Sequence, residues 1–316
     1  MKPTDPSNLR VAGPPSARSP GLGDAIWSIQ SKYAPYLFVS PFVILFGVFM
    51  LYPLARSLSL SFYQTYGPNY SKFVGLGNYR FLMQDKVFWL AVLNTTLYTV
   101  GFLIIQIPAS LLLAILLNNR LLRGRSFFRF AFFSSNLVGH VFVAVLFSIL
   151  LNPRHGLINR ALSLALPGDV QLNWLSNPML ALPATLIAGL WLAIGFGMIY
   201  FLAALQAVDK DLYEAAEVDG AGTCSQFWHV TIPGIRPVMI FMILIGTIGA
   251  FQLFELPYVM FQGPGPNYSA LTIVMYLFMM GFEVGDLGYG AAIGWMLVII
   301  IFLVSLAQLR TARETG

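Results

Sequence analysis

Acidic residues gather in one short stretch of this chain, residues 209–237, which reads DKDLYEAAEVDGAGTCSQFWHVTIPGIRP. Five of the 13 Asp and Glu residues lie in its first eleven positions: Asp209, Asp211, Glu214, Glu217 and Asp219. The spacing of Asp211 and Glu214 is that of a capping box, which predicts the start of a short helix. Gly220 is the expected end of that helix, and Pro233 the expected end of a second one. Two folded helices between apolar segments are more than a connector needs, so we interpret the stretch as a docking surface.

Titratable residues elsewhere are scattered. Glu255 is the only acid inside an apolar segment long enough to cross a membrane, and the three His residues show no metal-ligand spacing. A membrane-embedded enzyme that uses Glu255 and His140 is one hypothesis, although no second acid or metal-ligand set accompanies them. No G-x-x-x-x-G-K motif occurs, so we expect no ATP site of that kind. The single cysteine, Cys224, excludes an intrachain disulfide.

The composition is that of an integral membrane protein. Hydrophobic residues make up 57% of the 316 and charged residues only 10%, whereas soluble domains carry about a quarter charged residues. The net charge of +5 comes from residues that flank apolar segments, as expected when charge sets membrane orientation. We therefore expect the lipid bilayer, and not a nucleic acid, to be the surrounding partner.

Six apolar segments are long enough to cross a bilayer, at about 20 residues per crossing. They are predicted at about 36–58, 90–117, 130–151, 180–206, 237–261 and 287–309. Residues 1–25, rich in Pro, Ser and Gly, predict a disordered cytoplasmic tail ahead of a transmembrane domain over 26–316. Residues 62–86 predict a loop, and residues 269–282 a short helix at the outer face.

A basic loop sets the predicted orientation. Arg120, Arg123, Arg125 and Arg129 lie close together with no acid among them, which indicates the cytoplasmic side. Six spans then place both termini and the acidic stretch on that same side. The sequence predicts a multi-pass protein of the cytoplasmic (inner) membrane with both termini in the cytoplasm.

The acidic stretch resembles the EAA loop of ABC-importer permeases, E-A-A-x3-G-x9-I-x-L-P. The matching residues are Glu214-Ala215-Ala216, Gly220 and Val230-Thr231-Ile232-Pro233, with Val230 for Ile and Ile232 for Leu. From about residue 36 to 310 the chain is similar to the sugar-uptake branch, which includes maltose, glycerol-3-phosphate and trehalose permeases. The motifs that carry this likeness are Asn152-Pro153 with Gly156-Leu157-Ile158-Asn159, Leu205-Gln206-Ala207, and Gly263-Pro264-Gly265-Pro266. It resembles a six-span, MalF-like member of the branch.

The resemblance implies an all-α polytopic membrane protein with the type I ABC-importer permease fold and a cytoplasmic EAA coupling loop at 209–234. It implies a permease subunit that moves a sugar, such as a di- or oligosaccharide or a derivative, into the cytoplasm by alternating access. The implied partners are a MalG-like second permease, a homodimeric ATPase and an extracytoplasmic sugar-binding protein. ATP and Mg would bind to the ATPase, and this chain would bind no cofactor.

The resemblance also implies which residues dock on the ATPase. They are Leu212, Tyr213, Glu214, Ala215, Ala216, Val218 and Gly220. Glu214 would make the charged contact, the two alanines would allow close approach, and Gly220 would turn the chain. The alternative without the motif is that these acids form a solvated helix face.

A substrate path is expected on the fourth and fifth spans. Counted from the two motifs, the sugar contacts of the maltose permease fall on Gly189, Leu192, Ala193, Phe196, Thr247, Phe251 and Phe254. Most identities differ from the maltose case, which argues against maltose itself. Gln252 and Glu255 join the path because polar groups inside a membrane are costly and often functional. Other polar residues in the predicted spans are Asn94, Gln106, Asn136 and His140, for which structural hydrogen bonds between helices are the alternative. A permease for another solute, such as amino acids or peptides, is the alternative function.

Overall fold

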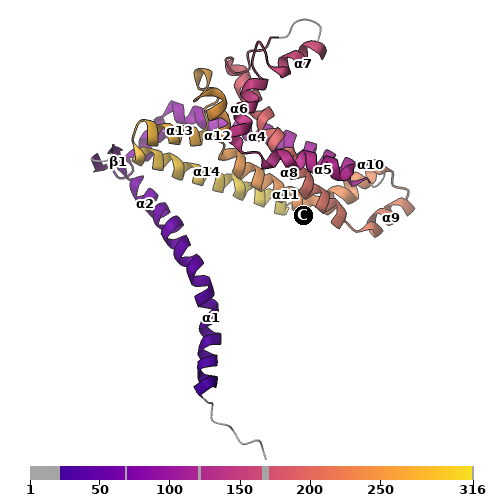
Figure 1. Ribbon diagram of the computed structural model, residues 1–316, viewed down its shortest axis with the longest axis horizontal. Coiled ribbons are helices and arrows are strands. Elements are labelled where there is room, and N and C mark those ends of the chain that lie inside the picture. Colours follow the sequence, from indigo (N-terminus) through magenta and orange to yellow (C-terminus); the bar gives the residue numbers. More distant parts are fainter. Residues whose placement is uncertain (1–21, 68–69, 120–121, 166–170, 315–316) are drawn as a thin grey trace, which may run out of the picture. The chain divides into compact units, whose positions relative to one another are not determined.

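The computed structural model of the chain describes residues 22–67, 70–119, 122–165 and 171–314 (Figure 1). Its contacts divide it at Arg56 into two units, and each is described by itself. Most of the predicted tail, residues 1–21, lies outside the described residues. The last four residues assigned to the tail, 22–25, are helical and belong to α1.

The first long helix is continuous over three segments. α1 (Leu22–Phe46) passes through a π-helical turn (Gly47–Leu51) into α2 (Tyr52–Leu60). Its Lys32–Leu60 part is 29 residues long and apolar enough to span a membrane. Pro53 has no N–H to offer the preceding turn, and the wider π-helical turn lies where that bond would have formed.

The predicted loop at 62–86 is folded, which corrects the expectation. β1 (Tyr63–Tyr66) and β2 (Tyr70–Phe73) form an antiparallel hairpin, followed by α3 (Gly77–Gln84). A remote carboxylate fixes the hairpin, because Asp286 Oδ1 accepts hydrogen bonds from the Thr65 N–H at 3.2 Å and the Tyr289 N–H at 3.0 Å. Partners more than 200 residues apart leave no signal in the local sequence, so the hairpin was not predictable from its own residues.

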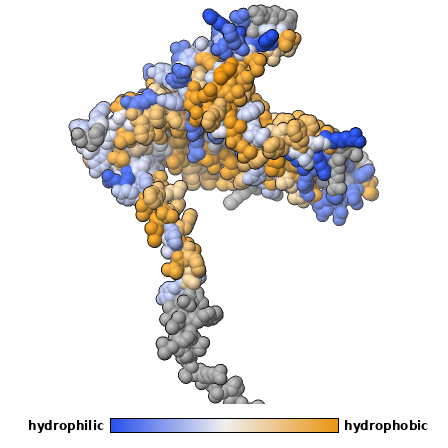
Figure 2. Space-filling model, in the orientation of Figure 1, coloured by the Kyte–Doolittle hydropathy of each residue, from blue (hydrophilic) through white to orange (hydrophobic). Residues whose placement is uncertain are grey.

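Four long helices form the bundle of the second unit. They are α4 (Lys86–Asn118), α8 (Pro178–Ala207), α11 (Ile232–Phe251) and α14 (Leu287–Glu314). α4 packs along α8, and one core cluster joins Leu111, Phe201 and Ile235 of three different helices. Hydrophobic side chains cover the middle of the helices, and hydrophilic ones gather at the end that carries α9 (Lys210–Val218) and α10 (Thr223–Gln226) (Figure 2). The spans predicted at 90–117, 180–206 and 287–309 each lie within one of these helices.

The third predicted span, 130–151, is not a straight helix. α5 (Arg125–Ser134) leads through a 3-10 turn (Ser135–Leu137) to α6 (His140–Leu150), with a bend of 101° between them. The Ser135 hydroxyl donates to the Phe132 carbonyl at 2.8 Å, and the backbone is extended at Val138 and Gly139. The described residues thus contain five unbroken helices long enough to span a membrane, or six spans if the bent pair counts as one.

The fifth span begins earlier and ends earlier than predicted. α10 (Thr223–Gln226), a π-helical segment (Phe227–Thr231) and α11 form one helix of 29 residues, so Pro233 does not end a helix. This helix stops at Phe251, and a break separates it from α12 (Glu255–Phe261).

Short elements complete the chain. A 3-10 turn (Pro266–Tyr268) follows α12 and leads to α13 (Ile273–Phe278), which continues as a π-helical segment (Met279–Glu283). The short helix expected at 269–282 is therefore present. Asn94, one of the polar residues in a predicted span, donates to the Tyr268 and Leu271 carbonyls at 2.9 and 3.1 Å. This supports the structural alternative for Asn94.

Candidate functional site

The stretch that resembles the EAA loop, residues 209–234, is called the EAA stretch below. It begins with a capped helix, α9 (Lys210–Val218). The cap is Asp209, whose Oδ1 accepts the Asp211 N–H at 3.1 Å, and not the predicted Asp211. Asp211 lies inside the first turn instead, where its negative charge interacts favourably with the positive end of the helix dipole. The acids at this end of α9 thus have a local structural role as well as an exposed position.

Gly220 ends α9 as predicted. Its φ of +77° is in the left-handed region, which costs a residue with a Cβ about 1 kcal/mol or more. The Gly220 N–H donates to the Glu217 carbonyl at 3.0 Å, and the Ala221 N–H donates to the Ala216 carbonyl at 2.8 Å. These two bonds are a Schellman motif, which satisfies the last carbonyls of the helix. No other atom lies within 4 Å of a Cβ placed on Gly220, so the turn faces open space.

The predicted docking residues divide between two sides of α9. Leu212 and Val218 leave 54% and 88% of their surfaces exposed, although both are aliphatic. Glu214 and Ala215 are exposed too. Tyr213 is half-buried, and its hydroxyl lies 2.9 Å from the Thr231 hydroxyl, within hydrogen-bond distance. Ala216 is also half-buried. Tyr213 therefore connects α9 to the following long helix. The outward surface is formed by Leu212, Glu214, Ala215 and Val218.

The second half of the EAA stretch is part of the bundle. Because α10 and α11 belong to one helix, the residues after Gly222 continue directly to the helix end at Phe251. At 1.5 Å per residue, Gly246 lies about 35 Å along this helix from Thr223. One continuous helix therefore connects the EAA stretch to the middle of the bundle.

A central cavity of about 210 Å³ lies in that region. Gly189, Leu192, Ala193 and Phe196, the four residues predicted on the fourth span, all line it. The other lining residues come from α4, the bent segment, α11, α12 and the turn before α12. They are Tyr98, Phe102, Gln106, Asn136, His140, Met242, Ile245, Gly246, Gly249, Ala250, Leu253 and Leu256.

One side chain of the cavity has an unused hydrogen-bonding atom. Gln106 is buried, and its Oε1 has no hydrogen-bond partner among the described residues. Its Nε2 donates to the Ser110 hydroxyl at 3.3 Å, and that hydroxyl donates to the Ile194 carbonyl at 3.0 Å. A buried acceptor without a donor is costly, so a ligand hydroxyl that reached it would stabilise this arrangement. The aromatic pair Tyr98 and Phe102, with ring centroids 5.8 Å apart, is stacked beside it.

The fifth-span residues predicted for the substrate path lie elsewhere. Thr247 Oγ1 donates to the Ile243 carbonyl and accepts from Gln308 of α14, both at 2.8 Å. Phe251 is buried in a core cluster with residues of α4 and α14, and Phe254 packs its ring on Tyr258 and Phe278. Gln252 and Glu255 are exposed at the break before α12. None of the five lines the central cavity.

The residues predicted on the fifth span miss the central cavity for a geometric reason. Each residue turns a helix by about 100°, so a position one residue too far moves a side chain off the cavity face. Thr247 directly follows Gly246, and Phe251 directly follows Ala250, both of which line the cavity. The cavity face of α11 carries Met242, Gly246 and Gly249, whereas Thr247 and Phe251 share the face toward α14. Gly246 and Gly249 line the cavity but were not among the predicted residues, because counting the maltose permease's sugar contacts from the two motifs selected Thr247 and Phe251 instead.

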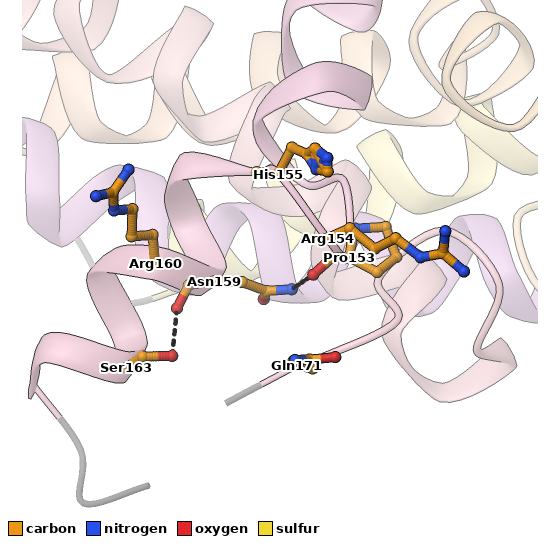
Figure 3. A pocket seen from close by; sticks show the side chains of 8 residues that line it. Pro153, Arg154, His155, Asn159, Arg160, Ser163 and Gln171 are labelled. Atoms are coloured by element: carbon orange, nitrogen blue, oxygen red, sulfur yellow. Dashed lines mark hydrogen bonds between the residues drawn. The ribbon is translucent and has the colours of Figure 1, made fainter. Parts of the chain in front are cut away.

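The Asn-Pro motif has a structural explanation. Asn152 Oδ1 accepts the N–H groups of Arg154 and His155 at 3.0 and 3.2 Å, which closes the turn after α6. Asn159, in α7 (Leu157–Ala165), donates to the Pro153 and Leu172 carbonyls and accepts from the Trp174 indole at 2.8 Å. Figure 3 shows Asn159 reaching Pro153 beside a cavity of about 430 Å³, with Arg154 and Arg160 at its sides. The motif fixes the fold of this segment.

No part of the chain that the structure describes offers a metal centre. Within those ranges no three His, Cys, Asp or Glu side chains lie close enough to hold an ion. Of His140 and Glu255, the pair considered for catalysis, only His140 lines the central cavity.

Comparison with known proteins gives consistent similarities. The family model described as "Binding-protein-dependent transport system inner membrane component" matches residues 106–313. The arabinooligosaccharides transport system permease protein AraP of Bacillus subtilis (strain 168) is 38% identical over 310 residues, 98% of this chain and 97% of the relative. The lactose transport system permease protein LacF of Rhizobium radiobacter is 37% identical over 281 residues, 88% of this chain and 94% of the relative.

A solved structure shares the fold. One chain of a bacterial alginate ABC transporter, crystallised in complex with its alginate pentasaccharide-bound periplasmic protein, superposes with a TM-score of 0.79. The alignment covers 92% of this chain and 98% of that chain, at 22% sequence identity. At that identity the likeness concerns the fold alone. The helical architecture described above is therefore shared with that chain.

Proposed function

This chain belongs to the family of inner membrane components of binding-protein-dependent transport systems, and we propose that it is one of two permease subunits of a sugar importer. The sugar would be a di- or oligosaccharide or a derivative, delivered by an extracytoplasmic binding protein. Relatives named for arabinooligosaccharide and lactose transport support the substrate class. The family is one of transport components, so the membrane-enzyme hypothesis is set aside on that ground.

The observation that carries the proposal is the single helix from Thr223 to Phe251. One end follows the EAA turn at Gly220, and the other end passes the central cavity at Gly246 and Gly249. Glu214, Ala215, Leu212 and Val218 would contact a groove of a homodimeric ATPase, which binds ATP and Mg. Closure of the ATPase would displace α9 and, through this helix, the walls of the cavity.

The cavity supports a hydroxylated substrate. Gln106 contributes a polar side chain to the cavity wall, and the rings of Tyr98 and Phe102 offer apolar surface. The described residues that line the cavity include no Asp, Glu, Lys or Arg, which favours a neutral group over a free amino acid with its two charges. Alternating access would open this cavity first to the binding protein and then to the cytoplasm. In the orientation that the basic loop at residues 120–129 predicts, both termini and the EAA loop would lie in the cytoplasm.

The first experiment identifies the partners. We would tag this chain in its own host, extract the membranes in mild detergent and identify the co-purifying proteins by mass spectrometry. We expect a second permease of similar size and an ATPase, because the exposed aliphatic residues of α9 need a partner surface. An equally tagged, unrelated polytopic protein from the same host is the control.

A second measurement separates solute classes. Uptake by cells with and without this chain would be compared for labelled arabinotriose, lactose, trehalose, an amino acid and a dipeptide. We expect loss of uptake for a saccharide only. Recovery of the chain alone from membranes that contain both partners, or loss of amino-acid or dipeptide uptake, would contradict the proposal.

A further inference from the structure

A second cavity lies at the other end of the bundle. It has a volume of about 510 Å³ and shares no lining residue with the central cavity. Its walls come from the hairpin, α3, the residue that caps α4, α13 with the π-helical segment after it, and the beginning of α14. At 1.5 Å per residue, the 33 residues of α4 separate its two ends by about 50 Å. Figure 1 shows β1 and α9 at opposite ends of this unit.

Exposed aromatic rings form one side of this outer cavity. Phe81 leaves 62% of its surface exposed and contacts Tyr289 edge-on, with the ring centroids 5.2 Å apart. Tyr66 is 55% exposed, and its hydroxyl accepts a hydrogen bond from Gln64 Nε2 at 3.2 Å. Both exposed rings line the cavity. Such rings offer a flat apolar surface, and the C–H faces of a sugar ring pack on surfaces of this kind.

Fixed polar groups form the other side. Asp85 caps α4 by accepting the N–H groups of Val87 and Phe88, and it also accepts the hydroxyls of Tyr276 and Tyr289. Burial alone would raise the pKa of the Asp85 carboxyl, but these hydrogen bonds outweigh burial and hold the pKa below its usual value. The carboxylate is therefore charged at neutral pH. The network links α4, α13 and α14 and holds the two tyrosines in place.

A second carboxylate is held equally firmly but keeps an atom available. Asp286 is buried, and its Oδ1 accepts the Thr65 N–H, the Thr65 hydroxyl and the Tyr289 N–H. Its Oδ2 accepts no hydrogen bond from a described residue and is not fully enclosed. Gln64 from the hairpin also lines the cavity. Preorganised acceptors beside exposed rings are the combination that recognises a hydroxylated ring.

The charges of the cavity limit the ligand further. Among the residues that the structure describes, it is lined by two carboxylates and by no Lys, Arg or His. An anionic ligand would face uncompensated repulsion there. A metal ion needs several free oxygen ligands, and the hydrogen bonds of Asp85 already occupy both of its oxygens. These observations leave a neutral, hydroxyl-bearing ligand.

We propose that this outer cavity is a second saccharide-binding site, specific for neutral sugars. The groups that recognise the sugar are Gln64, Tyr66, Phe81, Asp286 and the hydroxyls of Tyr276 and Tyr289. The inference rests on the proposed function, because it takes the solute to be a saccharide. In the proposed orientation the site faces the extracytoplasmic side, so a sugar meets it before the central cavity.

The test is a binding measurement on the intact transport complex in nanodiscs, without ATP or binding protein. The complex carries Gly249→Leu, which fills the central cavity, so that the remaining binding reports the outer site. The probes are maltotriose, arabinotriose and trigalacturonate, and titration calorimetry gives Kd. We expect at least one neutral trisaccharide to bind and trigalacturonate to bind at least tenfold more weakly.

Two substitutions locate the site. Phe81→Ala and Gln64→Ala should each weaken neutral trisaccharide binding about three- to tenfold, the range for one lost contact. Phe73→Ala is the matched control. Phe73 is an exposed aromatic residue of the hairpin that carries Gln64, but it does not line the cavity, so its loss should leave Kd unchanged. Partner recovery and thermal unfolding confirm that each variant is folded.

Three results would overturn the proposal: no neutral sugar binding to the Gly249→Leu complex, equal binding in both cavity variants and the control, or dependence of binding on a divalent cation. These results are distinct from failure of the proposed function, which is judged from uptake by the wild-type complex. A complex that imports a saccharide without binding one at this cavity would refute only the outer site.

Discussion

Individual residues decide how closely the helices approach. A Cβ on Gly195 of α8 would overlap the carbonyl oxygen of Phe132 in α5, so only a glycine allows the observed packing. The overlapping atom belongs to the backbone and cannot rotate away as a side chain does. The bend between α5 and α6 begins just after this contact, which makes Gly195 the residue against which the bent segment is positioned.

Gly195→Ala is therefore expected to destabilise the protein by about 1–3 kcal/mol, the range for overpacking a filled interface. The measurement is thermal unfolding of the purified complex in detergent, where the midpoint should fall by several degrees. Gly249→Ala is the matched control, since it is also a helical glycine but has no atom within 4 Å of an added Cβ. Equal midpoints for the two variants would show that the α5–α8 contact is not as close as described.

At the scale of elements, α9 is a small unit with its own cap and stop. Asp209 begins it, the Schellman turn at Gly220 ends it, and the contact of Tyr213 with Thr231 fixes it to the long helix. Its outward surface then has no structural function inside the chain. This is the surface on which we propose that the ATPase docks.

Gly220→Asp is expected to reduce recovery of the ATPase with the tagged chain severalfold, while membrane insertion and recovery of the second permease stay normal. An added Cβ meets no atom of the described residues within 4 Å, so we expect the effect to fall on the partner and on the left-handed turn. Gly222→Asp is the matched control for charge, because Gly222 is two residues away, equally open, and has an ordinary φ of −70°.

A third variant separates strain from docking. Asn tolerates the left-handed conformation better than other residues with a Cβ, so Gly220→Asn adds bulk with little strain. If the turn must stay small because a partner approaches it, Gly220→Asn should also lose the ATPase. Unchanged ATPase recovery with both Gly220 variants would refute docking at this turn.

At the scale of the whole molecule, the central cavity and the EAA loop are connected by one helix, and the outer cavity is separate from both. Gly249 provides a direct test of the central cavity, because it lines the cavity and has open space at the Cβ position. Gly249→Leu should abolish sugar uptake, leaving partner recovery and the unfolding midpoint close to wild type.

The control for this prediction is Gly249→Ala, which adds one methyl group and should retain most of the uptake. The decisive comparison is uptake normalised to the amount of complex in the membrane. Wild-type uptake by the Gly249→Leu variant would exclude the central cavity as the substrate path.

Sequence alone determined the features that depend on local composition. Apolar length predicts the helices α4, α8 and α14, because a helix satisfies its own backbone hydrogen bonds and needs only an apolar surface to lie in a bilayer. The turn at Gly220 follows from the same kind of signal, since a Schellman motif involves only six neighbouring residues. The EAA and Asn-Pro motifs, read the same way, indicated the permease family that the comparisons confirm.

Only the tertiary structure decided which surfaces face each other. The hairpin depends on Asp286, 221 positions from Thr65, and the third span is bent where α8 offers a glycine to its backbone. The cavity residues of α11 differ from the predicted ones because a shift of one position rotates a side chain by about 100° around the helix axis. Local sequence fixes where a helix lies along the chain, but its rotation about its own axis is set by packing against remote neighbours.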